Sequence, residues 1–590
     1  MRVRQYFSAL TAVTGTSLLA LASAPAFAQS VAPTRDELTR PQPDAAPPRS
    51  TLNVVGGVER SPCPLANPEF ADVRVRVAEV QFNNLKGASA SEMRRTWADF
   101  AGTDQPVAVI CEIRDRAATL LRDKGYLAAV QVPTQRIENG IVRLEVLYAR
   151  VTTIRARGQT GGAEAKLAGY LSKLTEDEVF DRNRAERYML LARDIPGYNV
   201  QLTLKPAGTA PGELIGEVSV IRQPYALDAV VQNLAANETG RWGGQLRGQV
   251  YGLTGLGDST FVSAYSTLDF KEQQIVQVGH SFRPGSEGLT ISGQFTYAWT
   301  KPSIDSEPGD PDVKARTLFA TLGLSYPMIR TQSRNLTLGG GLDYVDQKVD
   351  FIGALTRDHL RVAFVRADFD AVDLKSRRPK WRVGGGIEFR QGLGILGATK
   401  RSDNVLPSRD DGRATGTLVR LQAAGELALS DALAVAVAPR AQIGFNPLLS
   451  FEEFTAGNYT VGRGYDPATL TGDSGAGISV ELRGPRIATF KRSRFLVQPY
   501  LFGDAAWVWN KRGNIVCGTG PGPAPAPEPA SCDDPEHLKS AGGGIRAGLD
   551  GRLSIDAAVA VPLEKAGIDN RRGGPRFLLT LTTRLLPWRS

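Results

Sequence analysis

The sequence is poor in the residues that build most active sites and most membrane helices. Its 590 residues include only three histidines, four cysteines and four methionines. No window contains the 18 or more consecutive apolar residues that a spanning helix requires, and the mean hydropathy of -0.19 is consistent with this. These shortages exclude a helical membrane protein and leave little material for histidine- or cysteine-based chemistry.

The first 28 residues form a predicted secretory signal. Arg2 and Arg4 are basic, an apolar run follows, and Ala26-Phe27-Ala28 provides an A-x-A cleavage site, so we expect the mature chain to begin at Gln29. An exported chain without membrane helices is either soluble or a transmembrane β-barrel. The 62 glycines, set against few methionines and cysteines, favour the barrel. Removal of the two arginines lowers the formal charge from +9 to +7, and this charge does not single out nucleic acid, so we predict no nucleic-acid partner.

Motifs that suggest catalysis lack their supporting residues. Gly472-Asp473-Ser474-Gly475 matches the sequence around the nucleophile of trypsin-like serine proteases, which also need a histidine base oriented by an aspartate. His280, His359 and His537 lie in segments without such a pattern, and no G-x-S-x-G is present. Gly542-Gly543-Gly544 opens no predicted helix, so it is not a dinucleotide fingerprint. We predict no enzyme activity, no cofactor and no metal site.

The cysteines fall into two pairs that an oxidising compartment would allow to form disulfides. Cys63 and Cys111 lie near the amino terminus, and Cys517 and Cys532 flank a segment rich in proline, glycine and alanine. We expect the second bond to close a surface loop, with free thiols as the alternative.

Two consecutive regions share one predicted order of elements. Residues 29–72 are rich in proline and predict a loosely ordered extension or linker with at most one short helix, near Asp36 to Arg40. Residues 73–149 predict a strand, helices at 89–100 and 107–124, and two strands whose turn contains Asn139-Gly140. Residues 150–222 repeat the order β-α-α-β-β, and a repeat of about 75 residues is stronger evidence than either unit alone. Two unrelated α+β domains are the alternative.

From residue 223 the helical periodicity is replaced by alternating segments that are apolar on one face and polar on the other. Trp242, Trp299, Trp507, Trp509 and Trp588 are candidates for the aromatic girdles of a barrel. We count 16 segments, an even number that returns the chain to the side on which it started. They are 225–235, 242–253, 259–269, 273–282, 289–299, 315–330, 335–349, 359–373, 381–393, 416–429, 431–446, 476–487, 494–509, 540–550, 552–563 and 576–586.

The connection between predicted strands 11 and 12, residues 446–475, carries one arginine between two glycines. The tip reads Val461, Gly462, Arg463, Gly464 and Tyr465, and the glycines allow a tight turn that carries Arg463 away from its strands. Strand 13 contains Asp504, and the alternation there places Phe502, Asp504 and Ala506 in the lumen, because an unpaired carboxylate facing lipid is costly. We predict that Arg463 and Asp504 meet inside the barrel. An exposed loop arginine and an unrelated aspartate are the alternative.

These features resemble the two-partner secretion transporters of the haemolysin secretion and activation type, in the outer-membrane protein assembly superfamily. V-G-R-G-Y matches that family's V-R-G-Y loop motif with one inserted glycine, and Phe502-Gly503-Asp504-Ala505-Ala506 is similar to its F-x-D-x-G strand motif with alanine last. Three stretches of this sequence resemble the sequences of that family's two POTRA domains. They are Gly125-Tyr126, Val132-Pro133-Thr134-Gln135 with Asn139-Gly140, and Asp194-Ile195-Pro196-Gly197. The resemblance implies a mainly β protein: a 16-stranded antiparallel transmembrane β-barrel (223–590) behind two POTRA domains. It also implies that the arginine and aspartate pair in the lumen. The sequence departs from some relatives in that the segment before the first POTRA domain is short and rich in proline, so we expect their plug helix to be absent or reduced here.

The resemblance further implies a function in protein transport. POTRA domains in the periplasm would capture a large, unfolded, exported partner protein by strand addition, and the barrel would release it across the outer membrane of a Gram-negative bacterium. Outer-membrane lipid would surround the barrel, and periplasmic chaperones and barrel-assembly machinery would support its biogenesis. One alternative is a barrel-assembly insertase, although such proteins commonly have more than two POTRA domains. Another is a passive porin, whose porin activity needs no POTRA domain.

Overall fold

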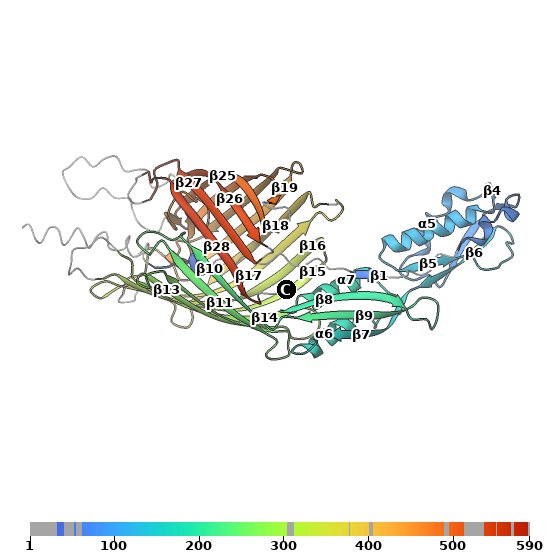
Figure 1. Cartoon of the computed structure of the whole chain (residues 1–590), viewed down its shortest axis with the longest axis horizontal. Coiled ribbons are helices and arrows are strands. Elements are labelled where there is room, and N and C mark those ends of the chain that lie inside the picture. Colours follow the sequence, from blue (N-terminus) through green and yellow to red (C-terminus); the bar gives the residue numbers. More distant parts are fainter. Residues whose placement is uncertain are drawn as a thin grey trace, which may run out of the picture.

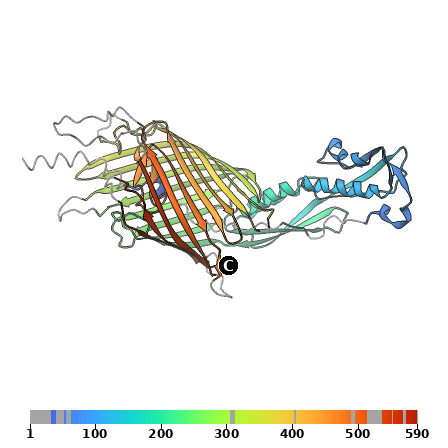
Figure 2. The same ribbon diagram turned by 90° about the horizontal axis from the view of Figure 1, so that it is seen from above.

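The computed structural model describes residues 32–39, 52–54, 62–303, 312–376, 378–400, 405–488, 495–511, 536–549, 552–567 and 572–587. A large barrel forms one part of an elongated molecule, and two small α+β units extend from one end of it (Figures 1 and 2). We call that end of the barrel the near end and the opposite end the far end. The predicted signal, Cys517, Cys532 and Trp588 lie outside the described residues. Within them, no helix is both long and apolar enough to cross a bilayer.

The barrel contains the 16 predicted strands and closes where its first strand pairs with its last. Neighbours are antiparallel throughout, and the two-residue β24 (Ile487–Ala488) adds a short pairing beside β25. In the described part of the chain the strands are β10 (Tyr225–Gln232), β11 (Gly243–Tyr251), β12 (Ser259–Thr267), β13 (Gln273–Phe282), β14 (Thr290–Thr300), β15 (Lys314–Arg330), β16 (Arg334–Asp350), β17 (Ala354–Val372), β18 (Trp381–Gly392), β19 (Thr417–Ala428), β20 (Ala434–Gly444), β23 (Ser474–Arg483), β25 (Phe495–Trp509), β26 (Glu536–Leu549), β27 (Leu553–Pro562) and β28 (Arg576–Leu586).

Side chains along the strands alternate between lumen and outside, as the period-2 pattern predicts. On β25, Leu501 is 62% exposed while Asp504 is 4% exposed. Large apolar side chains dominate the outer face, and Trp242, Trp299, Trp507 and Trp509 are exposed there. The even number of strands places the end of β28 at the near end, next to the α+β units (Figure 1).

The first α+β unit packs one long helix on a three-stranded sheet. The sheet has the order β3-β6-β5, from β3 (Glu79–Asn83), β6 (Ile141–Tyr148) and β5 (Ala128–Gln131). Helix α5 (Val109–Asp123) buries an apolar stripe at helical spacing, with Ile110, Ile113 and Ala117 fully covered, and it ends before Gly125, whose φ is +100°. The predicted turn also forms, with positive φ at Asn139 and Gly140. A second ladder joins β2 (Arg74–Arg76) to β4 (Asp104–Pro106).

The helix predicted at 89–100 is wrong as a single element. It divides into α4 (Ala90–Arg94) and the 3-10 turn η3 (Ala98–Phe100). Trp97 leaves helical geometry with φ of −135° and packs into the core, so tertiary packing overrides the local spacing.

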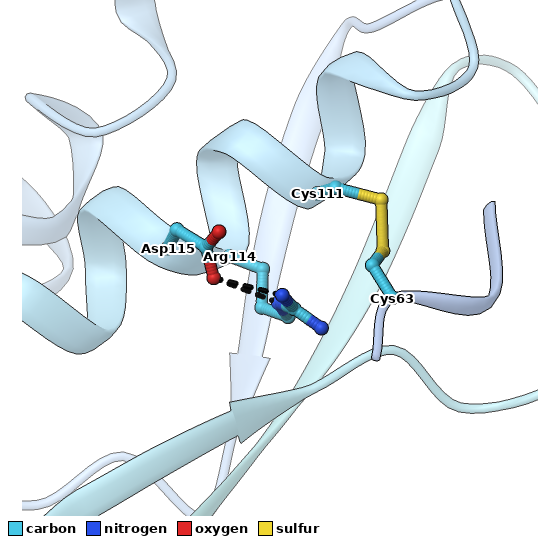
Figure 3. Close-up of a disulfide and its surroundings, with 4 residues drawn as sticks. All are labelled: Cys63, Cys111, Arg114 and Asp115. Atoms are coloured by element: carbon cyan, nitrogen blue, oxygen red, sulfur yellow. Dashed lines mark hydrogen bonds and ion pairs between the residues drawn. A yellow bond between two sulfur atoms is a disulfide. The ribbon is translucent and has the colours of Figure 1, made fainter. Parts of the chain in front are cut away.

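A disulfide joins Cys63, near the end of the extension, to Cys111 in the first turn of α5, with the Cα atoms 5.9 Å apart. Figure 3 shows the bond beside the ion pair of Arg114 and Asp115 on the same helix. The two cysteines lie 48 residues apart, and closing a loop of that length stabilises a small unit by about 2–4 kcal/mol.

The second α+β unit has the same order of elements and lies against the barrel. It contains β7 (Arg150–Gly158), α6 (Glu164–Ser172), α7 (Arg182–Arg193), β8 (Tyr198–Pro206) and β9 (Glu213–Arg222), with sheet order β8-β9-β7. The end of α7 meets the end of β15, where Arg330 binds Asp194 through Nε to Oδ2 (2.8 Å) and Nη2 to Oδ1 (2.7 Å). Glu186 also accepts a hydrogen bond from the backbone N–H of Gln332 (2.6 Å).

The expectation of a loosely ordered extension is wrong for two of its segments. Residues 32–39 lie inside the barrel and contain the four-residue helix α3 (Arg35–Leu38), which a capping box of Thr34 and Glu37 stabilises. Residues Leu52–Val54 form β1, which adds to the second unit as a parallel strand on β8, with Leu52 opposite Leu202. The short helix was predicted close to this position; the strand was not, because three residues carry too little pattern.

Candidate functional site

The connection between β20 and β23, residues 445–473, folds into the barrel lumen. It contains the turn η4 (Ser450–Glu452) and a small antiparallel ladder of β21 (Phe454–Ala456) with β22 (Leu470–Gly472). Its apolar residues form one core with inward-facing residues of β25 and β26, comprising Phe454, Ala456, Val461, Tyr465, Leu470, Ala506, Val508 and Leu538. We call residues 445–473 the inner loop.

Both glycines at the tip of the inner loop are required by the geometry. Gly462 has φ of +117°, a region that side chains rarely adopt. Gly464 has ordinary φ but lies against the wall, where an added Cβ would be 2.8 Å from the Cβ of Ser540 and from the backbone N of Pro562. Together the two glycines allow the tip to turn tightly and to lie against the barrel wall, so that Arg463 contacts the strands.

The structure brings Arg463 and Asp504 together. Arg463 donates from Nε to Oδ2 (3.0 Å) and from Nη2 to Oδ1 (2.8 Å), and its backbone N–H also donates to Oδ2 (3.0 Å). Hydroxyl groups of Ser479 (2.7 Å) and Ser540 (3.3 Å) donate to the same carboxylate. Asp504 is therefore surrounded by hydrogen-bond donors in a buried position, which fixes its geometry.

The guanidinium of Arg463 also reaches a neighbouring strand. Its Nη1 donates to Oε1 of Glu481 on β23 (2.8 Å), and Glu481 in turn accepts two hydrogen bonds from Arg546 on β26 (both 2.8 Å). The tip is thereby connected to three adjacent strands rather than to one residue.

The remaining predicted site residues surround this pair. The ring of Phe502 lies under Arg463, with the guanidinium carbon 3.6 Å from its centroid, a cation–π arrangement. On the next strand, an added Cβ at Gly542 would be 2.6 Å from Cζ of Phe502, so the ring occupies the space that this glycine leaves. The hydroxyl of Tyr465 lies 2.9 Å from the carbonyl oxygens of both Lys539 and Glu564, and Val461 and Ala506 are buried in the shared core.

Asp473 and Ser474 of the G-D-S-G sequence form hydrogen bonds at the base of the inner loop. Asp473 accepts hydrogen bonds from the backbone N–H of Leu448 (2.6 Å) and of Lys511 (2.7 Å) and from Nη1 of Arg409 (2.8 Å). The hydroxyl of Ser474 accepts from the backbone N–H of Gly444 (3.1 Å). The segment joins β22 to β23 and holds the base of the loop between β20 and β25.

Sequence reasoning missed a second cluster, of six charged groups, in the lumen. Arg390 on β18 is fully buried and donates from Nε and Nη2 to both carboxylate oxygens of Glu452 in the inner loop (2.8 Å each). The same arginine binds Asp343 on β16 (2.7 Å) and Glu388 (3.0 Å). Arg35 of α3 and Arg420 of β19 complete the cluster. No local signal distinguishes these charges from other inward-facing ones, because their elements are far apart in sequence.

The segment 32–39 touches the inner loop as well as the wall. Asp36 accepts hydrogen bonds from the hydroxyl of Thr455 in the loop (2.6 Å) and from Arg440 on β20 (3.1 Å). Leu38 is buried, and its carbonyl accepts from Gln277 on β13 (3.0 Å). A cavity of about 1080 Å³ remains beside the two segments, lined by strands β10 to β14 among others. Two pieces of the chain itself therefore occupy much of the lumen.

Comparison with known proteins identifies the barrel and the first α+β unit. The family model of the haemolysin secretion/activation protein ShlB/FhaC/HecB matches residues 218–521, just over half of the chain. The chain belongs to this family. A model of the ShlB-type POTRA domain matches residues 75–148, so the first α+β unit is a POTRA domain. The protein is thus a two-partner secretion transporter of the outer membrane.

Solved structures show the same fold at low sequence identity. CdiB from Escherichia coli aligns with 99% of this chain over 100% of its own length, at a TM-score of 0.68 and 16% identity. CdiB from Acinetobacter baumannii aligns over the same shares at a TM-score of 0.60 and 16% identity. BamA from Haemophilus ducreyi lacking POTRA domains 1-3 aligns with 87% of this chain and 100% of its own, at a TM-score of 0.50 and 14% identity. No curated protein matches the sequence itself.

Proposed function

We propose that the two α+β units lie in the periplasm and capture an unfolded, exported partner protein, which then crosses the barrel lumen and folds outside. The partner is a large secreted protein, and the second α+β unit acts as a second POTRA domain. Family membership supports transport of a partner protein, and the position of both units at the near end of one barrel supports capture before translocation.

The observation that carries the capture step is the pairing of β1 with β8. Strand β8 is the edge of its own three-stranded sheet, and a short extended segment of the chain is hydrogen-bonded to it in parallel register. The edge of the second unit therefore accepts an extended polypeptide through its main chain. A partner segment that displaces β1 would gain the same hydrogen bonds, and neighbouring side chains would select among sequences.

A tethered edge tests this step. Asn53 and Thr203 are Cα partners across β1 and β8, so Asn53→Cys with Thr203→Cys should form a disulfide that keeps β1 in place. We expect secretion of the partner to fall at least tenfold under oxidising conditions and to recover on reduction. The matched control is Gln201→Cys with Ser219→Cys, partners across β8 and β9 in the same sheet, which leaves the edge unchanged. Normal secretion by the edge-tethered protein would show that capture occurs elsewhere.

Removal of both units tests their role as a whole. A chain without residues 73–222 should still insert in the outer membrane, because the barrel strands are intact, but should release no partner. Release at the normal level would contradict the role of the units. Failure to release the partner, together with defective assembly of other outer-membrane barrels, would favour the insertase.

A further inference from the structure

The buried charge cluster links two segments that must both move if a polypeptide is to pass. Glu452 belongs to the inner loop, and Arg35 belongs to the segment 32–39. Arg390 binds Glu452 directly, and Arg35 shares the acceptors of Arg390, lying 3.6 Å from Asp343 and 3.3 Å from Glu388. With both segments in place, the side chains of Arg390 and Asp343 are 0% and 1% exposed, so their charges are balanced by the other members of the cluster and not by water.

The cluster is electrically neutral only when both segments are present or both are absent. Three arginines, Arg35, Arg390 and Arg420, oppose three carboxylates, Asp343, Glu388 and Glu452. Departure of the segment 32–39 alone removes the positive charge of Arg35 and leaves two positive charges against three negative ones. Departure of the inner loop alone removes the negative charge of Glu452 and leaves three positive charges against two negative ones. Departure of both segments leaves two positive charges and two negative charges.

An unpaired buried charge is strongly destabilising, so the two half-released states are unfavourable. Asp36 does not change this conclusion, because its partner Arg440 has a side chain 26% exposed and lines the cavity, where water can solvate it. The hydrogen bond from Thr455 to Asp36 adds a direct contact between the segments.

We propose that Arg390 is a positioning residue that makes release of the inner loop and release of the segment 32–39 one coupled event. It holds the acceptors of both segments in a single buried network, so that each segment stabilises the other in the lumen. This inference rests on the proposed function in that both segments must leave the translocation path. It differs from the Arg463 pair, which holds the tip of the loop and does not contact the segment 32–39.

Two buried reporter residues can measure the release of each segment separately. Leu38→Cys reports on the segment and Ala456→Cys on the inner loop, since both positions are buried and become reactive only on release. The full-length protein in liposomes, with Cys517 and Cys532 replaced by serine, is labelled with a membrane-impermeant maleimide, and the two rates are compared. No partner protein is needed, so failure of the coupling and failure of secretion are distinguishable.

Substitutions in either segment should act on the other. Glu452→Gln leaves an excess positive charge and should raise the labelling rate at Leu38→Cys about tenfold or more; Arg35→Gln leaves an excess negative charge and should do the same at Ala456→Cys. The double substitution restores balance, so its effect should be smaller than the product of the two. Arg584→Gln is the control, because Arg584 on β28 pairs with Asp228 on β10 (3.1 Å), an ion pair that includes no member of the cluster. Unchanged labelling at the opposite segment would overturn the proposal.

Substitution of Arg390 separates positioning from general damage. Arg390→Met leaves two positive against three negative charges, so Ala456→Cys should label faster while Leu38→Cys does not. Arg390→Lys retains the charge and should restore most of the coupling. A rise at both reporters in Arg390→Met, with no rescue by lysine, would show a merely structural role and would contradict the proposal.

Discussion

Two arginine–aspartate pairs attach separate parts of the chain to the barrel, with nearly the same geometry. Arg463 holds the inner loop to Asp504 by two parallel hydrogen bonds of 3.0 and 2.8 Å, and Arg330 holds the second α+β unit to Asp194 by bonds of 2.8 and 2.7 Å. Their surroundings differ. The side chains of the first pair are 20% and 1% exposed, and those of the second are 21% and 34% exposed.

The difference shows that distance alone does not determine what an ion pair contributes. Asp504 accepts further hydrogen bonds from two serines and one backbone N–H, so loss of its partner leaves a buried charge. Asp194 is one-third exposed, so water can replace its partner. We expect the buried pair to hold the inner loop firmly and the exposed pair to contribute little to docking of the second unit.

The largest effect is expected from Asp504→Ala. It removes the acceptor of Arg463 and of the serines, and should weaken attachment of the inner loop by about 3–5 kcal/mol. The labelling rate at Ala456→Cys should rise by two orders of magnitude or more, while insertion in the membrane is retained and transport is impaired. Asp504→Asn keeps one acceptor oxygen and should give an intermediate rate. An unchanged rate in Asp504→Ala would mean that the tip contact does not hold the loop.

The next largest effect is the interaction free energy between Arg463 and Asp504. Arg463→Ala and Asp504→Ala together should cost less than the sum of the single substitutions, with an interaction of about 1–3 kcal/mol, because each single change already removes the shared contact. The same labelling assay completes the cycle. Strict additivity would show that the two residues act independently.

Asp194→Ala should have a smaller effect on docking of the second unit, about 1 kcal/mol or less. Hydrogen exchange of the backbone amides at the end of α7 measures it, and the difference from the unsubstituted protein should nearly vanish in 1 M salt, where exposed charges are screened. Labelling at Ala456→Cys should change much less with salt. A large, salt-independent effect of Asp194→Ala would remove the distinction between the two pairs.

The smallest effect is expected at an exposed pair on the first α+β unit, Lys124 with Glu92, whose side chains are 32% and 36% exposed. Hydrogen bonds from Lys124 and from the backbone and hydroxyl of Ser89 lower the pKa of Glu92 from 4.5 to about 2. A lowered pKa in the folded state stabilises the folded form above pH 4.5, and this stabilisation is lost as the pH falls through 2.

Glu92→Gln should therefore raise hydrogen exchange around Ser89 slightly at neutral pH and have no effect below about pH 2. Glu112→Gln, at another exposed ion pair of the same unit, is a control that leaves the capping box intact. A difference between Glu92→Gln and the unsubstituted protein that persists below pH 2 would argue against the charge as its cause.

The barrel and the Arg463 contact could be predicted because each depends on a local pattern. Alternation along a strand marks the lumen face, and Asp504 falls on that face whichever strands are its neighbours. Arg390, Glu452 and Arg35 form their contacts across the lumen from separate elements, and no spacing along the chain records which inward charges will meet. Strand β1 was missed for a related reason: its stability comes from an edge about 150 residues away in sequence rather than from its own three residues.

The empty position at Gly542 has a consequence for how such proteins are recognised. Phe502 can occupy its place beside Arg463 only because the adjacent strand offers no side chain at that point. The strand motif around Asp504 therefore continues on β26, in a residue that no motif along β25 can include. A sequence motif confined to one strand therefore describes only part of what the site requires. A relative with the F-x-D motif but a bulky residue opposite the phenylalanine would match the motif and still be unable to place the arginine in this contact.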